Sequence, residues 1–342
     1  MKILITGGCG FVGSNLAIYL KKKLNNSEIY SLDNLFRNGS QINKGRLKNF
    51  KIINYKINIQ DYKKISKLPK FDLIIDCCAE PAIEISNKDP DRVIGTNLIG
   101  TFNILKKCTA DKSKIIFLST SRVYSIESLR KLIKKKNIFN KINIKSKINE
   151  EFRTDLPKSL YGFSKLSSEE LIKEYNYSYK IKYIINRFGV IAGPWQFGKQ
   201  DQGFISLWVA KHLFKKKLSY IGFGGYGNQI RDVIHVDDAC EIIYLQILNF
   251  NNKFNNTFNI GGGLKNAVSL KQLTSKCEKL IGHKLKIKRL KKTSIFDIPY
   301  FVTDNNKITK FYNWKPLIGI DQILRDVQKW LIGNKKIKNY FQ

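Results

Sequence analysis

The chain has 342 residues, and its 61 Lys and Arg against 27 Asp and Glu give a formal net charge of +34. This length can bury a large core as one large domain or two coupled ones, and no apolar run is long enough to span a bilayer. The basic excess is mostly lysine and lacks the interleaved aromatic side chains of a nucleic-acid stacking platform, so we expect no specific nucleic-acid partner and no membrane partner.

The densest basic stretch covers residues 131–147, with three consecutive lysines at its centre. A solvated face or flexible loop explains such a run, and so does an electrostatic attraction for an anionic substrate; both interpretations stay open. The six cysteines include no Cys-x-x-Cys pair, which is typical of a reducing compartment. The first expected strand starts at residue 2 and leaves no room for a leader segment. We therefore expect a cytoplasmic protein, and we predict no metal site.

A strand, a glycine turn and a helix open the chain. Lys2–Thr6 is predicted to be a buried strand and Phe11–Lys23 an amphipathic helix, with Gly7-x-x-Gly10-x-x-Gly13 between them. In this order the first glycine permits a tight turn, the second lets the backbone approach a pyrophosphate, and the third allows close packing of helix on strand. A turn that serves packing alone is the alternative. The predicted cofactor contacts of the turn are Gly7, Gly10, Phe11, Val12 and Gly13.

The next strand, Glu28–Leu32, ends in Asp33, about 20 residues past the last glycine. A carboxylate at that place accepts hydrogen bonds from the adenosine ribose and repels a 2′-phosphate. We therefore predict NAD rather than NADP, with Asp33 and Asn34 as contacts, although the nearby Arg37 could pair with the 2′-phosphate of NADP.

Strands and helices continue to alternate along the chain. The predicted strands cover residues 50–55, 71–77, 113–119 and 181–186, and the predicted helices cover residues 91–108 and 160–175. Such alternation builds a Rossmann-type, doubly wound parallel sheet with helices on both faces. After residue 186 the chain becomes rich in glycine and aromatic loops. We expect an NAD-binding domain at 1–186, to which residues 228–250 return, and a smaller α/β substrate lobe at 187–335.

Tyr161-Gly-Phe-Ser-Lys165 lies on the second predicted helix. A residue and its fourth neighbour share one helix face, so the lysine, together with the positive nicotinamide ring of a bound dinucleotide, can lower the pKa of the phenol, which is ordinarily about 10. Such a tyrosine can move a proton to or from a substrate hydroxyl while a dinucleotide takes a hydride. The alternative is an ordinary solvated Tyr and Lys pair.

Several ordered motifs carry a family resemblance. They are Thr6-Gly-Gly-Cys-Gly-Phe-Val-Gly13, Asn97-Leu-Ile-Gly-Thr101, Ser119-Thr-Ser-Arg-Val-Tyr124, Tyr161-Gly-Phe-Ser-Lys165, Arg231-Asp-Val-Ile-His-Val-Asp-Asp238 and Phe258-Asn-Ile-Gly261. Through them nearly the whole chain resembles the extended short-chain dehydrogenase/reductase superfamily of NAD-dependent nucleotide-sugar epimerases and dehydratases. Residues 193–205 are most similar to its CDP-paratose 2-epimerase (tyvelose epimerase) branch.

The resemblance implies roles for individual residues. Tyr161 is expected to be the general base, Lys165 to bind the nicotinamide ribose, and the Thr120 hydroxyl to bridge Tyr161 and the reacting substrate oxygen. The further cofactor contacts that it implies are Asn58, Ile59, Ala79, Asn97, Tyr161 and Lys165, with Asn97 bracing its loop from inside a helix. The substrate contacts that it implies are Glu80, Thr120, Ser121, Arg122, Gln196, Gln202, Arg231 and Asn259, with Arg231 on a nucleotide phosphate. His235 is expected to be structural.

The chain also departs from its relatives. Dehydratases of the superfamily follow the threonine with an Asp-Glu pair that eliminates water, whereas this chain has Ser121-Arg122. Reductases of free keto sugars commonly use NADP, which Asp33 opposes. Many relatives supply a second phosphate-binding arginine near the C-terminus, where this chain has Ile298-Pro-Tyr300.

We predict an NAD-dependent nucleotide-sugar epimerase, similar to CDP-sugar 2-epimerases, that inverts a ring carbon through a transient keto sugar. A nucleotide-sugar 4-epimerase and a 4-keto-sugar reductase remain alternatives. An alternative of another class is a catalytically silent sugar-nucleotide or RNA-binding relative. The expected partners are a nucleotide-diphosphate sugar, first a CDP-sugar, and a second copy of the chain. In the family two helices, here at 91–108 and 160–175, form the interface of a homodimer.

Overall fold

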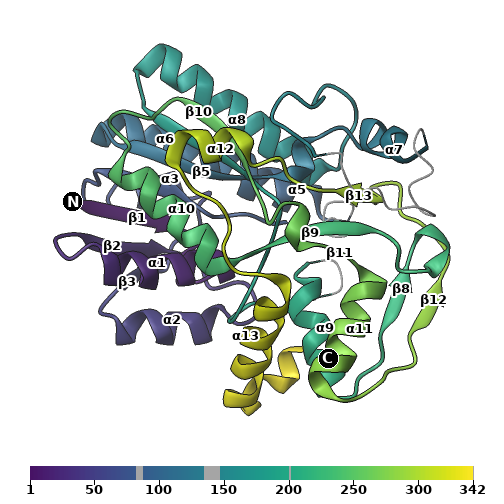
Figure 1. Cartoon of the computed structure of the whole chain (residues 1–342). Helices are drawn as coiled ribbons and strands as arrows, with labels where there is room; N and C mark the ends of the chain where they lie inside the picture. Colours follow the sequence, from purple (N-terminus) through teal and green to yellow (C-terminus); the bar gives the residue numbers. More distant parts are fainter. Residues whose placement is uncertain (82–87, 135–146, 200–201, 342) are drawn as a thin grey trace. The chain divides into compact units, whose positions relative to one another are not determined.

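The computed structural model describes residues 1–81, 88–134, 147–199 and 202–341 (Figure 1). They fold into two compact units, each assembled from separate stretches of the chain. Unit 1 contains Met1–Val123, Ser159–Arg187 and Cys240–Phe258, and unit 2 contains Tyr124–Lys158, Phe188–Ala239 and Asn259–Gln342. The predicted domain boundary after residue 186 stays a prediction. Most of the basic stretch at 131–147 lies outside the described residues.

A seven-stranded sheet forms the centre of unit 1, with the strand order β10-β6-β5-β4-β1-β2-β3. The neighbouring strands from β5 to β3 pair in parallel. The strands are β1 Lys2–Thr6, β2 Glu28–Leu32, β3 Ile53–Tyr55, β4 Leu73–Asp76, β5 Lys114–Thr120, β6 Tyr183–Phe188 and β10 Asn256–Ile260. This confirms the predicted Rossmann-type parallel sheet.

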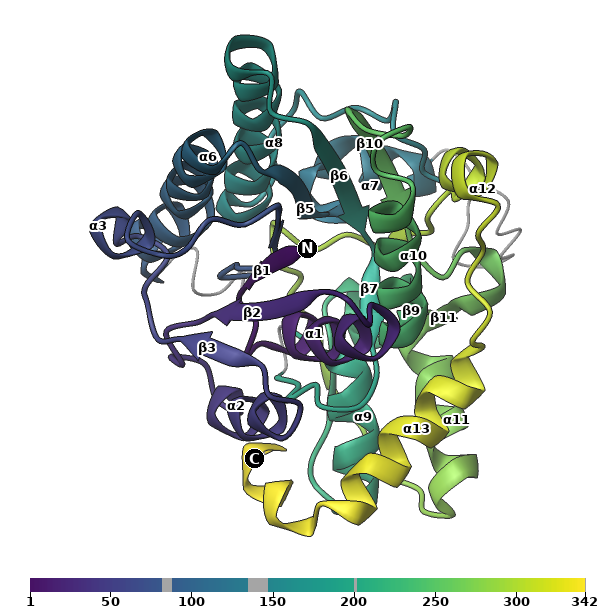
Figure 2. The same cartoon turned by 90° about the vertical axis from the view of Figure 1, so that its left-hand side faces the viewer.

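Helices cover both faces of this sheet. They are α1 Phe11–Lys23, α2 Ser40–Asn49, α3 Tyr62–Ile65, α5 Pro90–Ile94, α6 Gly100–Asp111, α8 Leu160–Tyr179 and α10 Val236–Leu248. Figure 2 shows α1 and α2 along one face and α6 and α8 along the other. Leu4, Ile74 and Phe117 of the strands pack with Ile104 of α6 and Ile172 of α8. Burial on both faces explains why these strands are nearly continuous apolar runs.

The predicted helix at 91–108 consists of three parts. A π-helical segment, η1 Gly95–Ile99, separates α5 from α6. Gly100 follows it, and a Cβ there would lie 2.7 Å from Cγ2 of Ile59. A π-bulge inserts one residue without ending the helix, so the sequence predicts one continuous helix instead. The strand predicted at 50–55 begins only at residue 53, because Phe50 ends α2 and Lys51 turns with a φ of +56°.

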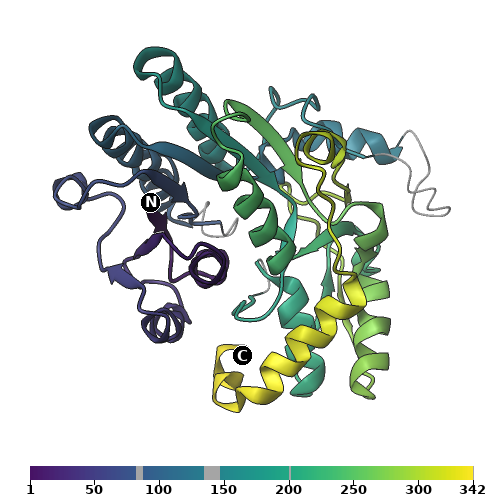
Figure 3. The same ribbon diagram turned by 60° about the vertical axis from the view of Figure 1, so that its left-hand side comes forward.

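Unit 2 has a four-stranded sheet in which β9 pairs with each of the other three strands. These strands are β7 Val190–Ala192, β9 Ile230–His235, β11 Ala267–Ser269 and β13 Tyr300–Phe301, and β8 Ser219–Ile221 pairs separately with β12 Lys288–Leu290. Three helices pack side by side, namely α9 Phe204–Leu213, α11 Leu270–Ile281 and α13 Ile320–Gly333 (Figure 3). The unit also contains α7 Ile126–Lys134 and α12 Asn306–Tyr312.

The cysteines are distributed over both units, and none of the six is in a disulfide. Cys9, Cys108, Cys240 and Cys277 are buried. Among the helices of the described residues, none combines the length and the apolar character needed to cross a membrane.

Candidate active site

The glycine turn after β1 excludes side chains. Gly7 has a φ of +61°, in the left-handed region, and the Gly10 N–H donates to the Gly7 carbonyl over 2.9 Å. A Cβ on Gly7 would lie 2.9 Å from Cα of Cys78, and one on Gly13 would lie 2.3 Å from the Gly7 carbonyl oxygen. The N-cap of α1 is Gly10, which makes no side-chain capping bond. The first N–H groups of α1 therefore suit a phosphate that approaches the bare backbone.

Asp33 lies beside this turn at the end of β2. Its Oδ2 accepts a hydrogen bond from the Cys9 N–H at 3.0 Å, and its Oδ1 accepts one from the Leu35 N–H at 2.7 Å. Burial raises the pKa of this carboxyl, whereas the bonds from Leu35 and Cys9 and the charge of Arg37 lower it. The carboxylate is thus oriented next to the glycine turn, where it suits the diol of a ribose.

Three other predicted cofactor contacts shape the loops after β2 and β3. The exposed side chains of Asn34 and Asn58 each accept a hydrogen bond from the backbone two residues on, at 3.0 and 3.1 Å. Ile59 is buried, and its carbonyl accepts a hydrogen bond from Nδ2 of Asn103 on α6 at 3.1 Å. The structure therefore gives each of them a local role in its loop, and their contacts with a cofactor stay predictions.

Thr120 and Tyr161 come together at the end of β5 and the start of α8. Their side chains are hydrogen-bonded, and the Thr120 oxygen also accepts the Arg122 N–H over 3.2 Å. Burial raises the pKa of the Tyr161 phenol, and the bond from Thr120 and the charges of Arg122 and Arg37 act in the opposite direction. Ser121 continues from β5 into a 3₁₀ turn. The sequence analysis assigned the lowering of this pKa to Lys165 and the nicotinamide ring, and it missed the two arginines.

Lys165 places its ammonium group inside unit 1. The residue is 1% exposed, and its Nζ has no hydrogen-bond partner in the described residues. Nζ lies 3.8 Å from the centroid of the Phe117 ring. Burial lowers the pKa of this group, and Asp76 is the first of the charges that raise it. A buried ammonium without an acceptor is costly, so Lys165 fits the hydroxyl groups of a nicotinamide ribose.

Asn97 of η1 ties the loop after β4 to α8. Its Oδ1 accepts the Glu80 N–H at 2.8 Å, and its Nδ2 donates to the Glu80 carbonyl at 3.2 Å and to Ser164 Oγ at 3.0 Å. Ser164 in turn donates to the Tyr161 carbonyl at 2.9 Å. Asn97 thus braces the loop that contains Ala79, and the π-helical segment places it there.

Glu80 is a buried carboxylate between two arginines. Its Oε2 accepts a hydrogen bond from Arg92 of α5, and its Oε1 lies 3.5 Å from Nη1 of Arg37. The exposed fraction of the Glu80 side chain is 4%. Glu80 was predicted as a substrate contact, but the two ion pairs were not predicted. Sequence spacing offers no signal for them, because the three residues lie in three separate loops and helices.

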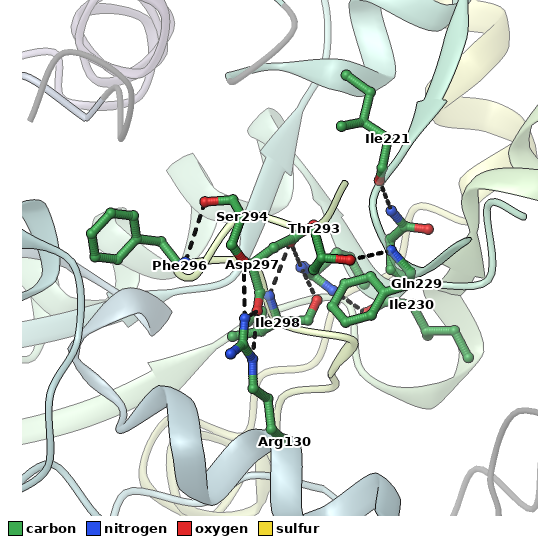
Figure 4. A network of polar contacts seen from close by, with 11 residues as sticks. Arg130, Ile221, Gln229, Ile230, Thr293, Ser294, Phe296, Asp297 and Ile298 are labelled. Carbon is green, nitrogen blue, oxygen red and sulfur yellow. Dashed lines mark hydrogen bonds and ion pairs between the residues drawn. The ribbon is translucent and has the colours of Figure 1, made fainter. Parts of the chain in front are cut away.

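Arg231 of β9 lies in unit 2 and faces the loop before β13. Its Nη1 and Nη2 donate to the carbonyls of Ile230 and Ile298 at 2.8 and 2.6 Å, and Nη2 lies 3.5 Å from Oδ1 of Asp297. Figure 4 shows Arg130 of α7 directed at the same loop. It donates to the carbonyls of Ser294 and Asp297 at 2.9 and 2.8 Å. The sequence analysis missed Arg130, which lies in a helix that also contains Lys131 and Lys134.

The remaining predicted substrate residues of unit 2 have their interaction partners within that unit. Gln196 donates to the Ile191 carbonyl at 3.0 Å and accepts from Ser206 at 2.8 Å. Asn259 is fully buried, with its amide between Tyr124 and the Ile148 carbonyl.

Two further residues of unit 2 also have local partners. The Gln202 backbone pairs with that of Lys199. His235 is buried, and its Nδ1 accepts the Asp237 N–H at 3.0 Å. These contacts favour positioning over direct binding, and the substrate roles of Gln196, Gln202 and Asn259 stay predictions.

Known proteins resemble the whole chain. The model of the NAD dependent epimerase/dehydratase family matches residues 3–261. CDP-paratose 2-epimerase of Salmonella typhi is 28% identical over 96% of this chain and 99% of its own length. A putative UDP-glucose 4-epimerase of Methanocaldococcus jannaschii is 30% identical over 98% of this chain and 99% of its own. The crystal structure of UDP-glucuronic acid 4-epimerase from Bacillus cereus in complex with UDP-glucuronic acid and NAD shares the fold, with a TM-score of 0.83, 24% identity, and coverage of 97% of this chain and 99% of that one.

Proposed function

Because the chain belongs to the NAD dependent epimerase/dehydratase family, we propose that it is a nucleotide-sugar epimerase that inverts one ring carbon through a transient keto sugar. The observation that carries this proposal is the grouping of Thr120, Tyr161 and Lys165 in the unit that also holds the glycine turn and Asp33. Similarity to CDP-paratose 2-epimerase over nearly the full length supports a CDP-sugar and inversion at C2.

In the proposed reaction each of the three side chains has its own role. Bound NAD would accept a hydride in its oxidised form and donate one in its reduced form. Tyr161 takes the proton of the sugar hydroxyl through its phenol oxygen, and Thr120 hydrogen-bonds to that oxygen. Lys165 holds the nicotinamide ribose with its buried ammonium group. When the keto sugar has presented its other face, Tyr161 returns the proton to the new hydroxyl.

Elimination of water is not supported by the residues around Tyr161. After Thr120 the chain continues with Ser121 and Arg122, where a dehydratase needs an acid to protonate the leaving hydroxyl. Arg122 is a permanent cation and cannot donate that proton at neutral pH. Epimerisation at C4 is the second candidate, because UDP-glucose and UDP-glucuronate 4-epimerases are also among the relatives.

The same helices that hold the active site support the proposed homodimer. Ile99 of η1 and Phe163 and Tyr177 of α8 are 45%, 50% and 77% exposed. Large apolar side chains gathered on one pair of helices are typical of a surface that a second copy covers. Light scattering at micromolar concentration should give the mass of a dimer, and a stable monomer would count against this assembly.

The substrate assignment is tested with a panel of CDP-, UDP-, GDP- and dTDP-sugars followed by NMR. We expect a new epimer from a CDP-sugar, with inversion at C2. Inversion at C4 of a UDP-sugar would replace the CDP-sugar assignment with the second candidate. A 4-keto-6-deoxy sugar as the accumulated product would instead identify a dehydratase.

A further inference from the structure

We propose that Arg37, Glu80 and Arg92 form an ionic bridge across the glycine turn that keeps the dinucleotide bound during turnover. This inference rests on the proposed function, because it assumes that NAD lies on the glycine turn. It assigns to the three residues a role in cofactor retention, separate from the chemistry at Tyr161.

The order of the strands determines where the ionic bridge lies. In the sheet β1 lies between β2 and β4, and the three strands are parallel. Arg37 follows β2, Glu80 follows β4, and the glycine turn follows β1, so all three lie at the same edge of the sheet. An ion pair that joins the first two loops therefore passes over the end of β1. Nη1 of Arg37 and Oε1 of Glu80 are 3.5 Å apart.

Arg92, the third residue of the ionic bridge, also contacts both the loop after β2 and the loop after β4. Arg92 donates a hydrogen bond to Oε2 of Glu80, and the centre of its guanidinium lies 4.2 Å from the centroid of the Phe36 ring. Phe36 directly precedes Arg37, so Arg92 contacts the loop after β2 and the loop after β4 at once. Asn97 fixes the backbone of Glu80 through two hydrogen bonds. The carboxylate is thus a fixed anchor for two cations.

The charges of the bridge suit a diphosphate. Two guanidinium groups share one carboxylate, which leaves one positive charge in excess over the turn that is built for phosphates. Guanidinium groups bind phosphate oxygens through paired donors. The charge of Arg37 lowers the pKa of the Tyr161 phenol and the charge of Glu80 raises it, so the charges of the bridge also act on the proposed base.

Retention matters for the proposed chemistry. The hydride removed from the sugar has to be returned to the same sugar, so NAD must stay in place between the two transfers. A dinucleotide under the bridge can leave only after the loops separate, which breaks the pair between Arg37 and Glu80. Loss of this pair should therefore increase the rate at which NAD dissociates.

The test is the dissociation rate of NAD from the full-length holoprotein. Labelled NAD is bound, and its exchange with unlabelled NAD is followed for Arg37→Met, Glu80→Gln, the double variant and Glu170→Gln. We expect each single variant to release NAD on the order of tenfold faster. The double variant should release it no faster than Glu80→Gln, because Glu80→Gln alone already removes both ion pairs of the bridge. Glu170 forms an exposed ion pair with Lys173 on α8 and serves as the matched control.

Thermal unfolding of each variant shows whether it is folded, and Arg37→Met is the safer variant because its side chain is 37% exposed. Unchanged exchange in both single variants would overturn the ionic bridge, whatever happens to epimerisation. Faster exchange that is additive in the double variant would also overturn it, since the residues would then act separately. If the parent protein binds no NAD at all, the proposed function fails together with the bridge.

Discussion

The hydroxyl oxygen of Thr120 accepts a hydrogen bond from the backbone N–H of Arg122 across 3.2 Å. With the Arg122 N–H on the oxygen, the proton of the hydroxyl is directed to Tyr161, where its hydrogen bond lowers the pKa of the phenol. The 3₁₀ turn Ser121–Val123 at the end of β5 therefore orients the donor that favours the phenolate.

Thr120→Val removes this donor with little change of volume. We expect turnover to fall by about 10²- to 10³-fold, because one positioned donor to a developing oxyanion is typically worth that much. Thr120→Ser keeps the hydroxyl and should retain most of the activity. Steady-state kinetics of the two variants with the sugar identified by NMR provides the measurement. Equal rates for the valine and serine variants would contradict the role of the hydroxyl.

The pH profile of Arg122→Met tests the charges around Tyr161. The Arg122 cation favours the phenolate, so it lowers the pKa of Tyr161. Without that charge the pKa rises, the base form becomes scarcer near neutrality, and the rise of kcat/KM with pH should shift to higher pH. Arg153→Met serves as the control, because Arg153 forms an exposed ion pair with Asp155 in unit 2. If both variants gave the same pH profile, the charge of Arg122 would not influence the pKa of Tyr161.

Asp33 determines the expected choice of dinucleotide. Its oriented carboxylate suits a ribose diol and repels a 2′-phosphate. Protein as purified should therefore carry NAD, and mass spectrometry of the denatured supernatant identifies the nucleotide. In Asp33→Ser we expect weaker NAD binding and a smaller preference against NADP in titrations. NADP as the main bound dinucleotide of the parent protein would show that Asp33 does not select the cofactor.

Breaking a buried ion pair should strongly destabilise unit 1. Arg187 of β6 donates to both carboxylate oxygens of Glu169 on α8, at 2.7 to 3.1 Å, and the two side chains are 7% and 0% exposed. Glu169→Gln leaves the arginine uncompensated, and we expect a loss of about 3–5 kcal/mol in the free energy of unfolding. Glu170 is the exposed neighbour of Glu169, and the free energy of unfolding of Glu170→Gln should stay within about 0.5 kcal/mol of that of the parent. Urea unfolding of the three proteins compares these values.

Solvent deuterium distinguishes hydride return from deprotonation at carbon. A hydride held on the nicotinamide is bound to carbon and does not exchange with water. The inverted carbon should therefore remain fully protonated when the reaction reaches equilibrium in deuterium oxide. NMR of the product measures this directly. Deuterium at that carbon would mean that a proton from water, and not the returned hydride, completes the inversion.

Local patterns predicted the parts of the fold that depend on neighbouring residues. The bounds of β1, α1 and β2 follow from apolar periodicity and from a glycine turn whose side-chain-free positions are required sterically. The predicted family, the Rossmann-type sheet and NAD as the cofactor of that family are confirmed. The residues chosen for the site stay predictions, although Thr120, Tyr161 and Lys165 lie in one unit as expected.

Long-range partners could not be predicted in this way. Glu80 pairs with Arg37 and Arg92 because three connections meet at one edge of the sheet, and no local spacing encodes that meeting. Arg130 reaches Asp297 across 167 positions of the sequence. The π-helical segment around Asn97 was not predicted either, because one extra residue in a turn does not end the helix.

The raised pKa values of five cysteine thiols predict an inert thiol chemistry in the folded protein, in which Cys77 and Cys78 are half-buried. Burial raises the pKa of Cys9 and of Cys277 to about 12, and it raises the pKa of Cys77, Cys78 and Cys108 as well. Only the thiolate is nucleophilic, so these groups should barely react with a maleimide at neutral pH while the protein is folded. Unfolding returns each thiol to its ordinary acidity. The rate of alkylation would therefore report the opening of the core directly, without any engineered probe.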